Sequence, residues 1–157
     1  MIVNPGELSA LRAEWQGVDR MRERVRHLVV STFAFDSDQS PTFGDVLYNL
    51  PLVLAFDVLT KVLLLAKQEG RFTAPGSELG DLMDGAKDAL SWINWQYLGE
   101  GVKRRNEVTR SAKLYGDLQC LLYIAHIEDQ LVAWDIINPP QARLPTRTVS
   151  LRQRFSE

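Results

Sequence analysis

The stretch VLYNLPLVLAFDVLTKVLLLA, residues 46–66, is the most hydrophobic part of the chain and predicts the core of its fold. Leucine and valine recur in it every three or four residues, which is the spacing of one helical face. Apolar residues also occupy much of the remaining circumference, so we predict a central helix from about Thr42 to Glu69. Asn49, Asp57 and Lys61 lie within it, and a bilayer-spanning helix rarely contains such residues, so we interpret it as a core helix. The expected buried stripe consists of Leu47, Leu50, Leu54, Val58, Val62 and Leu65.

Short-range signals define the ends of this helix. Ser40 precedes Pro41, and proline is favoured in the first turn of a helix, so the helix is predicted to begin there. Gly70 predicts its end, because glycine readily adopts the left-handed conformation that closes helices. Pro51 lies inside the pattern and has no backbone N–H to donate, so we expect it to kink or divide the helix.

Three further helical segments flank the central one. The first runs from about Pro5 to Val30, before a linker at 31–39, and its charged face predicts a solvated surface with ion pairs within the helix. The next is expected to start at Glu78, with Ser77 as its cap, and to continue to about Asn106. The last is expected over residues 114–137, where two prolines end it.

Apolar stripes on these segments indicate how they pack. The segment from Glu78 is expected to bury Leu79, Leu82, Ala86, Leu90, Ile93 and Tyr97. The last segment carries one stripe of Leu118, Leu121, Ala125 and Val132 and another of Ile124, Ile127, Leu131 and Trp134. Two apolar faces predict contact with more than one neighbour, including a second subunit. Because no alternating strand pattern is present, we predict an all-α, four- to five-helix up-and-down bundle.

The composition is that of one globular domain. The 157 residues are 45% hydrophobic and 24% charged, and a net charge of -2 gives no global attraction to nucleic acid. We assign residues 1–140 to a single helical domain. Residues 141–157 carry four arginines, so we interpret them as a basic, flexible tail, with a basic arm that touches a partner or RNA as the alternative. The first residues do not resemble a signal peptide, so we expect a cytoplasmic protein without membrane contact.

Few residues suited to catalysis or metal binding are present. Cys120 is the single cysteine and lies among leucines, so we expect a small buried hydrophobic residue rather than a reactive thiol. One cysteine and two widely separated histidines cannot form a zinc site, and the glycines do not form a phosphate-binding loop. We therefore predict neither a metal nor a cofactor.

The segment from Glu100 to Arg110 concentrates positive charge. Four cations lie within eight residues: Lys103, Arg104, Arg105 and Arg110. An arginine guanidinium matches phosphate oxygens with a rigid fork of donors, so the segment is a candidate anion-binding site. Glu100 can pair with Arg104 on one helical face, and Asn106 can orient a neighbour or bind a base edge. The structural alternative is that cations also favour the C-terminal end of a helix.

The same segment resembles the motif of the HEPN family. That motif is a glutamate, three residues, a lysine or arginine, then an arginine, a polar residue (often asparagine) and, a few residues later, a histidine. The matching residues here are Glu100, Arg104, Arg105 and Asn106. The run from Tyr123 to Trp134 is similar to the last helix of such domains. The resemblance spans roughly residues 42–137 and implies an all-α, often dimeric domain; many members are metal-independent endoribonucleases of toxin–antitoxin and phage-defence systems.

One position departs from the motif, because Arg110 stands where the family has histidine. In the family, arginine and histidine from two subunits converge on the scissile phosphate, the ribose 2′-hydroxyl attacks it, and a cyclic phosphate forms. An arginine side chain stays protonated near neutral pH, so Arg110 can bind phosphate but cannot act as the base. His126 lies more than a turn into the next helix and is not expected to replace the missing histidine.

The resemblance implies catalytic roles for Arg105, Asn106 and Arg110, phosphate binding by Lys103 and Arg104, and an orienting role for Glu100. Three hypotheses follow. The chain is a non-catalytic member that binds RNA or a partner, a ribonuclease toxin with an inactivating change at Arg110, or a helical interaction scaffold whose basic helix end is purely structural. The resemblance also implies a homodimer with RNA as its partner, and the toxin hypothesis adds an antitoxin partner such as a nucleotidyltransferase-like protein.

Overall fold

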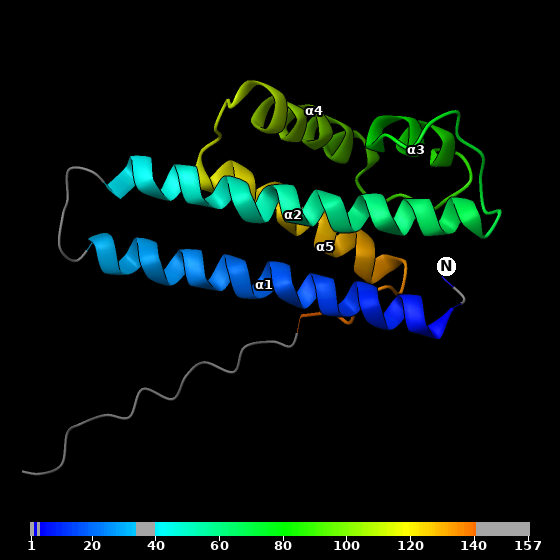
Figure 1. Cartoon of the computed structure of the whole chain (residues 1–157), viewed down its shortest axis with the longest axis horizontal. Coiled ribbons are helices and arrows are strands. Elements are labelled where there is room, and N and C mark those ends of the chain that lie inside the picture. Colours follow the sequence, from blue (N-terminus) through cyan, green and yellow to red (C-terminus); the bar gives the residue numbers. More distant parts are fainter. Residues whose placement is uncertain (1, 3, 34–39, 141–157) are drawn as a thin grey trace, which may run out of the picture.

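Residues 2, 4–33 and 40–140 are described by the computed structural model of the chain (Figure 1). They form five α-helices and no β-strand, which confirms the predicted all-α bundle. In chain order the helices are α1 (Pro5–Phe33), α2 (Ser40–Gln68), α3 (Leu79–Ala86), α4 (Trp95–Ser111) and α5 (Asp117–Ala133). α1 and α2 run antiparallel, and so do α4 and α5 (Figure 1). The tail predicted at 141–157 lies outside the described residues.

α2 is the central helix of the bundle, because α1, α3, α4 and α5 all contact it (Figure 1). Phe56, Leu59 and Leu63 are among its side chains that are fully excluded from solvent. Burial of each such side chain contributes about 1.5–3 kcal/mol, so α2 supplies much of the driving force for folding. The segment Val46–Gln68 is long and apolar enough to cross a membrane, but here other helices pack around it, as in the core of a soluble protein.

The buried face of α2 differs in part from the predicted stripe. Val58 and Val62 are buried as expected, but Leu50 is half exposed. Asn49 is buried beside it: its Nδ2 donates to the Tyr115 carbonyl at 2.9 Å, and its Oδ1 accepts from the Tyr115 N–H at 3.1 Å. A helix that is apolar on nearly all sides offers several similar faces, so periodicity alone did not select the buried one.

The ends of α2 agree with the sequence signals, whereas its interior does not. Pro41 lies in the first turn, and Gly70 follows the last turn with a φ of 75°. Two backbone hydrogen bonds of 3.0 Å, from the N–H groups of Gly70 and Arg71 to the preceding turn, complete a Schellman motif. Pro51 lies inside one continuous helix, so it does not divide α2, and the predicted kink stays a prediction. Packing on four other helices offsets the loss of one backbone hydrogen bond.

The single helix predicted over residues 78–106 is wrong, because the chain forms α3 and α4 with an irregular connector at 87–94. Gln130 on α5 binds this connector: its Nε2 donates to the Ser91 carbonyl at 3.2 Å, and its Oε1 accepts from the Ile93 N–H at 2.8 Å. Trp134 Nε1 donates to the same Ser91 carbonyl at 2.7 Å. These side chains satisfy backbone groups that a continuous helix would pair internally.

The break also changes which residues are buried. Ile93 and Tyr97, predicted on the buried stripe, are 57% and 54% exposed. α3 keeps its part of the stripe buried. Its N-cap residue is Glu78, whose backbone is extended, and no side chain caps the helix, so the predicted Ser77 cap is wrong.

α1 and α5 differ from the prediction at their ends. α1 continues past Val30 to Phe33, so the first residues of the predicted linker are helical. α5 is shorter than the predicted segment 114–137. Asp135, with a φ of 57°, turns the chain away after α5, so the helix ends before the two prolines are reached.

One of the two apolar stripes of α5 forms core. Ile124 and Leu131 of that stripe are fully buried, and Cys120 is buried as predicted. The other stripe is only partly buried: Leu118 is 79% exposed, whereas Leu121 and Val132 pack against the core. The two stripes therefore have different environments within this chain.

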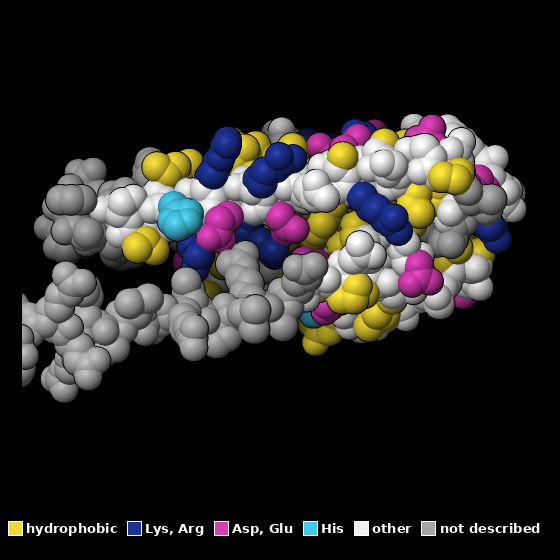
Figure 2. Space-filling model, turned by 90° about the horizontal axis from the view of Figure 1, so that it is seen from below, with side chains coloured by type: hydrophobic (Ala, Val, Ile, Leu, Met, Phe, Trp, Pro, Cys, Tyr) yellow, Lys and Arg dark blue, Asp and Glu magenta, His cyan; other side chains and the backbone are white. Residues whose placement is uncertain are grey.

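The charged face of α1 is the ion-paired solvent face that was predicted. Arg22 contacts Asp19 at 2.7 Å, and Arg26 contacts Glu23 at 2.6 Å. Figure 2 shows acidic and basic side chains interspersed on this side of the molecule. Because Arg22 and Arg26 each have an acid close by, this part of the face offers little net positive charge to an anion.

Candidate functional site

Gly101 allows α4, which carries the motif residues, to pack closely on α2 and α5. A Cβ at this position would lie 2.6 Å from Phe56 Cζ and 2.9 Å from Tyr123 Cδ1, closer than side chains tolerate. The next turn of the same face carries Arg105, and the close approach brings it against α2. Gly101 is therefore a packing residue that positions the motif.

Gly101→Ala is expected to destabilise the fold, whereas Gly99→Ala is expected to stabilise it. A methyl group at position 101 overpacks the core at a cost of about 1–3 kcal/mol. A Cβ at Gly99 meets nothing within 4 Å, so only the gain in helix propensity, up to about 1 kcal/mol, is expected there. Urea denaturation measures both free energies of unfolding. Two variants of equal stability would contradict the packing role of Gly101.

Arg105 is the least exposed arginine of the motif, with 23% of its side chain exposed. Its Nη2 lies 2.8 Å from Oδ1 of Asp57 on α2, and its Nη1 donates to Oδ1 of Asn106 at 3.3 Å. Its Nε is buried and has no hydrogen-bond partner among the described residues. The guanidinium is thus held in one orientation by α2 and by its own neighbour in sequence.

Asp57 belongs to this site although it was not predicted as a site residue. It lies 48 positions before Arg105, and in the sequence it only interrupts the apolar central helix. A carboxylate in such a helix is a signal in itself, because a partly buried charge needs a partner. Sequence spacing alone does not identify which cation provides that partner.

Arg104 points toward the loop between α4 and α5. Its Nη1 donates to the Tyr115 hydroxyl at 3.3 Å, and its guanidinium lies 5.1 Å from the centre of that ring. The same Nη1 lies 3.6 Å from Oε2 of Glu107. Glu100 is exposed and forms no ion pair with any described residue, so the expected Glu100–Arg104 pair is wrong. Glu107, one turn later and next to Tyr115, is the acid that Arg104 contacts.

The other motif cations project away from α2. Arg110 Nη2 lies 3.4 Å from Oε2 of Glu78, with the two side chains 68% and 72% exposed. Lys103 is exposed and forms no ion pair within the described part of the chain. Helical residues five apart leave the axis about 140° apart, so Arg105 and Arg110 point in different directions. Within one chain, therefore, the motif arginines do not converge on a single phosphate.

His126, on α5, lies beside the N-terminal end of α4, whereas the basic segment lies toward the C-terminal end of α4. Its ring stacks on Tyr97 with centroids 5.1 Å apart, and its Nδ1 lies 3.2 Å from Nδ2 of Asn94. Tyr97 precedes Arg105 by eight residues, which is roughly 12 Å along a helix. His126 is therefore not brought to the motif arginine in this chain.

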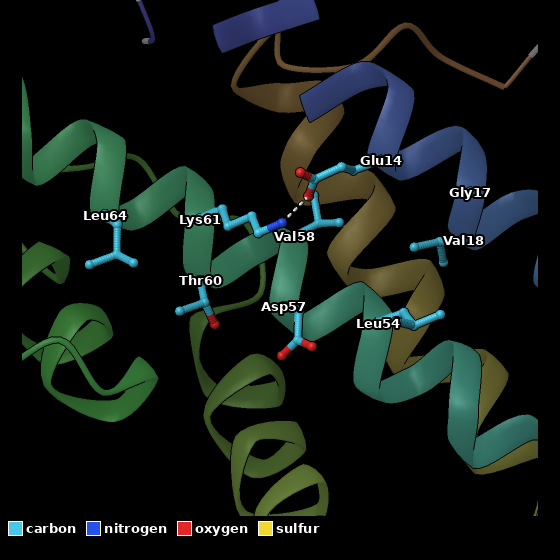
Figure 3. A pocket seen from close by; sticks show the side chains of 9 residues that line it. All are labelled: Glu14, Gly17, Val18, Leu54, Asp57, Val58, Thr60, Lys61 and Leu64. Carbon is cyan, nitrogen blue, oxygen red and sulfur yellow. Dashed lines mark hydrogen bonds and ion pairs between the residues drawn. The ribbon is translucent and has the colours of Figure 1, made fainter. Parts of the chain in front are cut away.

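A groove opens between α1 and α2 beside Asp57 (Figure 3). It encloses about 660 Å³, and Leu54 and Val58 contribute to its apolar lining. The Lys61 Nζ of α2 and the Glu14 Oε2 of α1 meet across it at 2.7 Å. Asp57 lines this groove and contacts Arg105 of α4, but Arg105 itself is not part of the lining.

Within the described residues, no group of three histidine, cysteine, aspartate or glutamate side chains could hold a metal ion. In comparisons with known proteins, the chain matches no family model, no curated protein and no solved structure. The function of the site must therefore be argued from its own residues, their contacts and their charges.

Proposed function

We propose that this chain is a HEPN-like, RNA-directed domain that binds RNA phosphate through Arg105 and has little or no cleavage activity. The environment of Arg105 carries the proposal: its guanidinium is partly buried and oriented by Asn106 and Asp57, and Asp57 lines a groove. Orientation by the residue that follows it matches the polar position of the motif. The proposal includes a cytoplasmic homodimer of toxin–antitoxin or phage-defence type, with a possible nucleotidyltransferase-like antitoxin.

When a phosphate binds Arg105, its oxygen replaces the Asp57 carboxylate as the hydrogen-bond acceptor. A phosphate oxygen replaces Asp57 Oδ1 at Nη2. A second oxygen can accept from Nε, which is buried and lacks a partner among the described residues, once Asp57 has turned away and exposed it. Two parallel donors on one edge of the guanidinium match the spacing of phosphate oxygens. The Asp57 side chain is 44% exposed, so it can turn toward water when the phosphate enters.

Cleavage additionally needs a proton acceptor. The ribose 2′-oxygen must lose its proton as it bonds to phosphorus, while the 5′-oxygen of the next nucleotide leaves and takes up a proton. Arg110, at the histidine position of the motif, stays protonated near neutral pH and cannot accept that proton. We therefore place the activity of the unmodified chain in RNA binding.

A non-enzymatic helical scaffold is the second candidate function. Arg104, Arg105 and Arg110 lie 3.6, 2.8 and 3.4 Å from carboxylate oxygens, so their charge is already compensated. Leu118 and Leu122 on α5 are 79% and 52% exposed and form an apolar strip of the kind that suits a protein partner. In a scaffold, Arg105 would only tie α4 to α2.

Substitution of Arg105 distinguishes the two functions. Arg105→Ala is expected to lower the affinity for a single-stranded RNA oligonucleotide by about ten- to a hundredfold, because hydrogen bonds to charged groups contribute about 1.5–3 kcal/mol. Fluorescence anisotropy at constant low salt measures this affinity, and circular dichroism verifies the fold.

Arg24→Ala is the matched control, because it removes an exposed arginine on α1 and should change the affinity much less. If the unmodified chain does not bind RNA, or if Arg105→Ala binds it as tightly, the scaffold is the better description.

A further inference from the structure

We infer that a hollow between α3 and α4 is a nucleobase-binding pocket; its ligand class rests on the RNA-directed function proposed above. The hollow encloses about 410 Å³, which lies within the range of about 300–1,000 Å³ typical of small-molecule sites. α3 contributes Asp84 and Met83 to its lining, and α4 contributes Trp95, Glu100 and Lys103. It is separate from the groove beside Asp57.

Glycines from both helices keep this hollow open. A Cβ at Gly80 or Gly99 would meet nothing within 4 Å, and neither residue has a positive φ. Gly85 and Gly101 differ, because a Cβ there would collide with the Thr73 carbonyl or with Phe56. Gly99 lies inside α4, where glycine costs about 1 kcal/mol relative to alanine. Neither packing nor backbone conformation requires glycine at this position, and its absence of a side chain leaves space for a ligand.

The charged side chains around the hollow are available to a ligand. Asp84, Glu100 and Lys103 form no ion pair with any residue that the structure describes. Carboxylates accept hydrogen bonds from the N–H groups of a base edge, and an ammonium donates to a ring nitrogen or a carbonyl. Trp95 lines the hollow and provides apolar surface for a ring, and Lys87 Nζ lies 4.5 Å from the centre of its ring; Met83 also lines the hollow but is almost fully buried. Two carboxylates and one ammonium favour guanine, which has several N–H donors, over uracil.

The pocket also accounts for motif residues that the Arg105 site leaves unused. Glu100 and Lys103 belong to the basic segment, yet both line the hollow and neither contacts Arg105 or Asp57. Arg105 faces α2, whereas the hollow faces α3. The two sites would therefore contact different nucleotides of one strand, and each can be tested separately.

Filling the hollow tests the inference. Gly99→Leu places a side chain in the hollow from a position with open space, and Gly17→Leu does the same in the groove between α1 and α2. Isothermal titration with GMP and anisotropy with a guanine-containing single-stranded RNA measure binding. Both affinities are expected to fall about tenfold or more in Gly99→Leu. Gly17→Leu should leave the GMP affinity unchanged, and Glu100→Gln should weaken GMP more than UMP.

The outcomes separate the pocket from the proposed function. Absence of GMP binding by the unmodified chain, or equal GMP affinity in Gly99→Leu, would overturn the pocket even if RNA binding depends on Arg105. GMP binding that Gly99→Leu abolishes supports the pocket even if Arg105→Ala has no effect on RNA. Competition between GMP and the RNA shows whether a base of the strand or a free nucleotide is the source of the ligand.

Discussion

Arg110→His is expected to raise RNA cleavage by about a hundredfold or more over the unmodified chain. A positioned general base contributes about 10²–10⁴-fold to such reactions, and histidine can accept a proton near neutral pH whereas arginine cannot. The substitution removes the contact between Arg110 and Glu78, but both side chains are mostly exposed, so the fold should be little affected.

The geometry of α4 adds a condition to this expectation. Positions 105 and 110 leave the helix about 140° apart, so an imidazole at 110 and the guanidinium of Arg105 in one chain would not meet on one phosphate. The gain should therefore require two copies of the chain. Cleavage by Arg110→His should increase more steeply than linearly with protein concentration until the pair is saturated.

Two variants control this experiment. Ser111→His adds the same imidazole one residue later on α4 and should give no comparable gain. Arg105→Ala combined with Arg110→His should abolish the gain. Cleavage of end-labelled RNA, followed on denaturing gels in the presence of EDTA, measures all of them. If Arg110→His binds RNA but does not cleave it, the catalytic scaffold is excluded while RNA binding by Arg105 stands.

Gln130→Leu is expected to lower the free energy of unfolding by about 1–3 kcal/mol. Gln130 is fully buried and holds the connector between α3 and α4 through the Ile93 N–H and the Ser91 carbonyl. Leucine has a similar volume, so the loss comes from the unpaired Ile93 N–H rather than from a cavity, at about 1–3 kcal/mol for an unsatisfied group. The Ser91 carbonyl keeps one bond, from Trp134.

Gln119→Leu is the matched control, because the same substitution is made on an exposed position of α5. Its effect should stay within about 0.5 kcal/mol. Chemical denaturation measures stability, and hydrogen exchange at the Ile93 amide reports the local contact. If the two variants are equally stable, Gln130 does not hold the break between α3 and α4.

Hydrophobic periodicity and turn chemistry were sufficient for the fold class and for the position of α2. These signals are local: the spacing of apolar residues defines a helix, and Gly70 ends it through its own backbone conformation. These signals did not predict the connector at 87–94, because Gln130, whose side chain binds the Ile93 N–H, lies 37 residues later on α5. This contact forms only when α5 packs against the connector, so the sequence pattern of residues 78–106 does not predict it.

The candidate site was likewise predictable from the sequence only in part. The residue types and spacing of the basic segment were visible in the sequence, as was the departure at Arg110. Their directions were not, because Arg104, Arg105 and Arg110 lie close together on one helix yet contact acids or rings from three different places. Asp57, the closest partner of Arg105, became part of the site only through the packing of α4 on α2.

The residue pattern alone was enough to predict an all-α chain, a central helix at 46–66 and a cluster of cations up to Arg110. The buried face of that helix, the break before α4 and the acid that holds Arg105 depend on how the helices pack. The two groups of features differ in how far along the chain their contacts reach. Helix formation and helix ends depend on neighbours within a few residues, whereas the direction of a guanidinium depends on which helix packs against it.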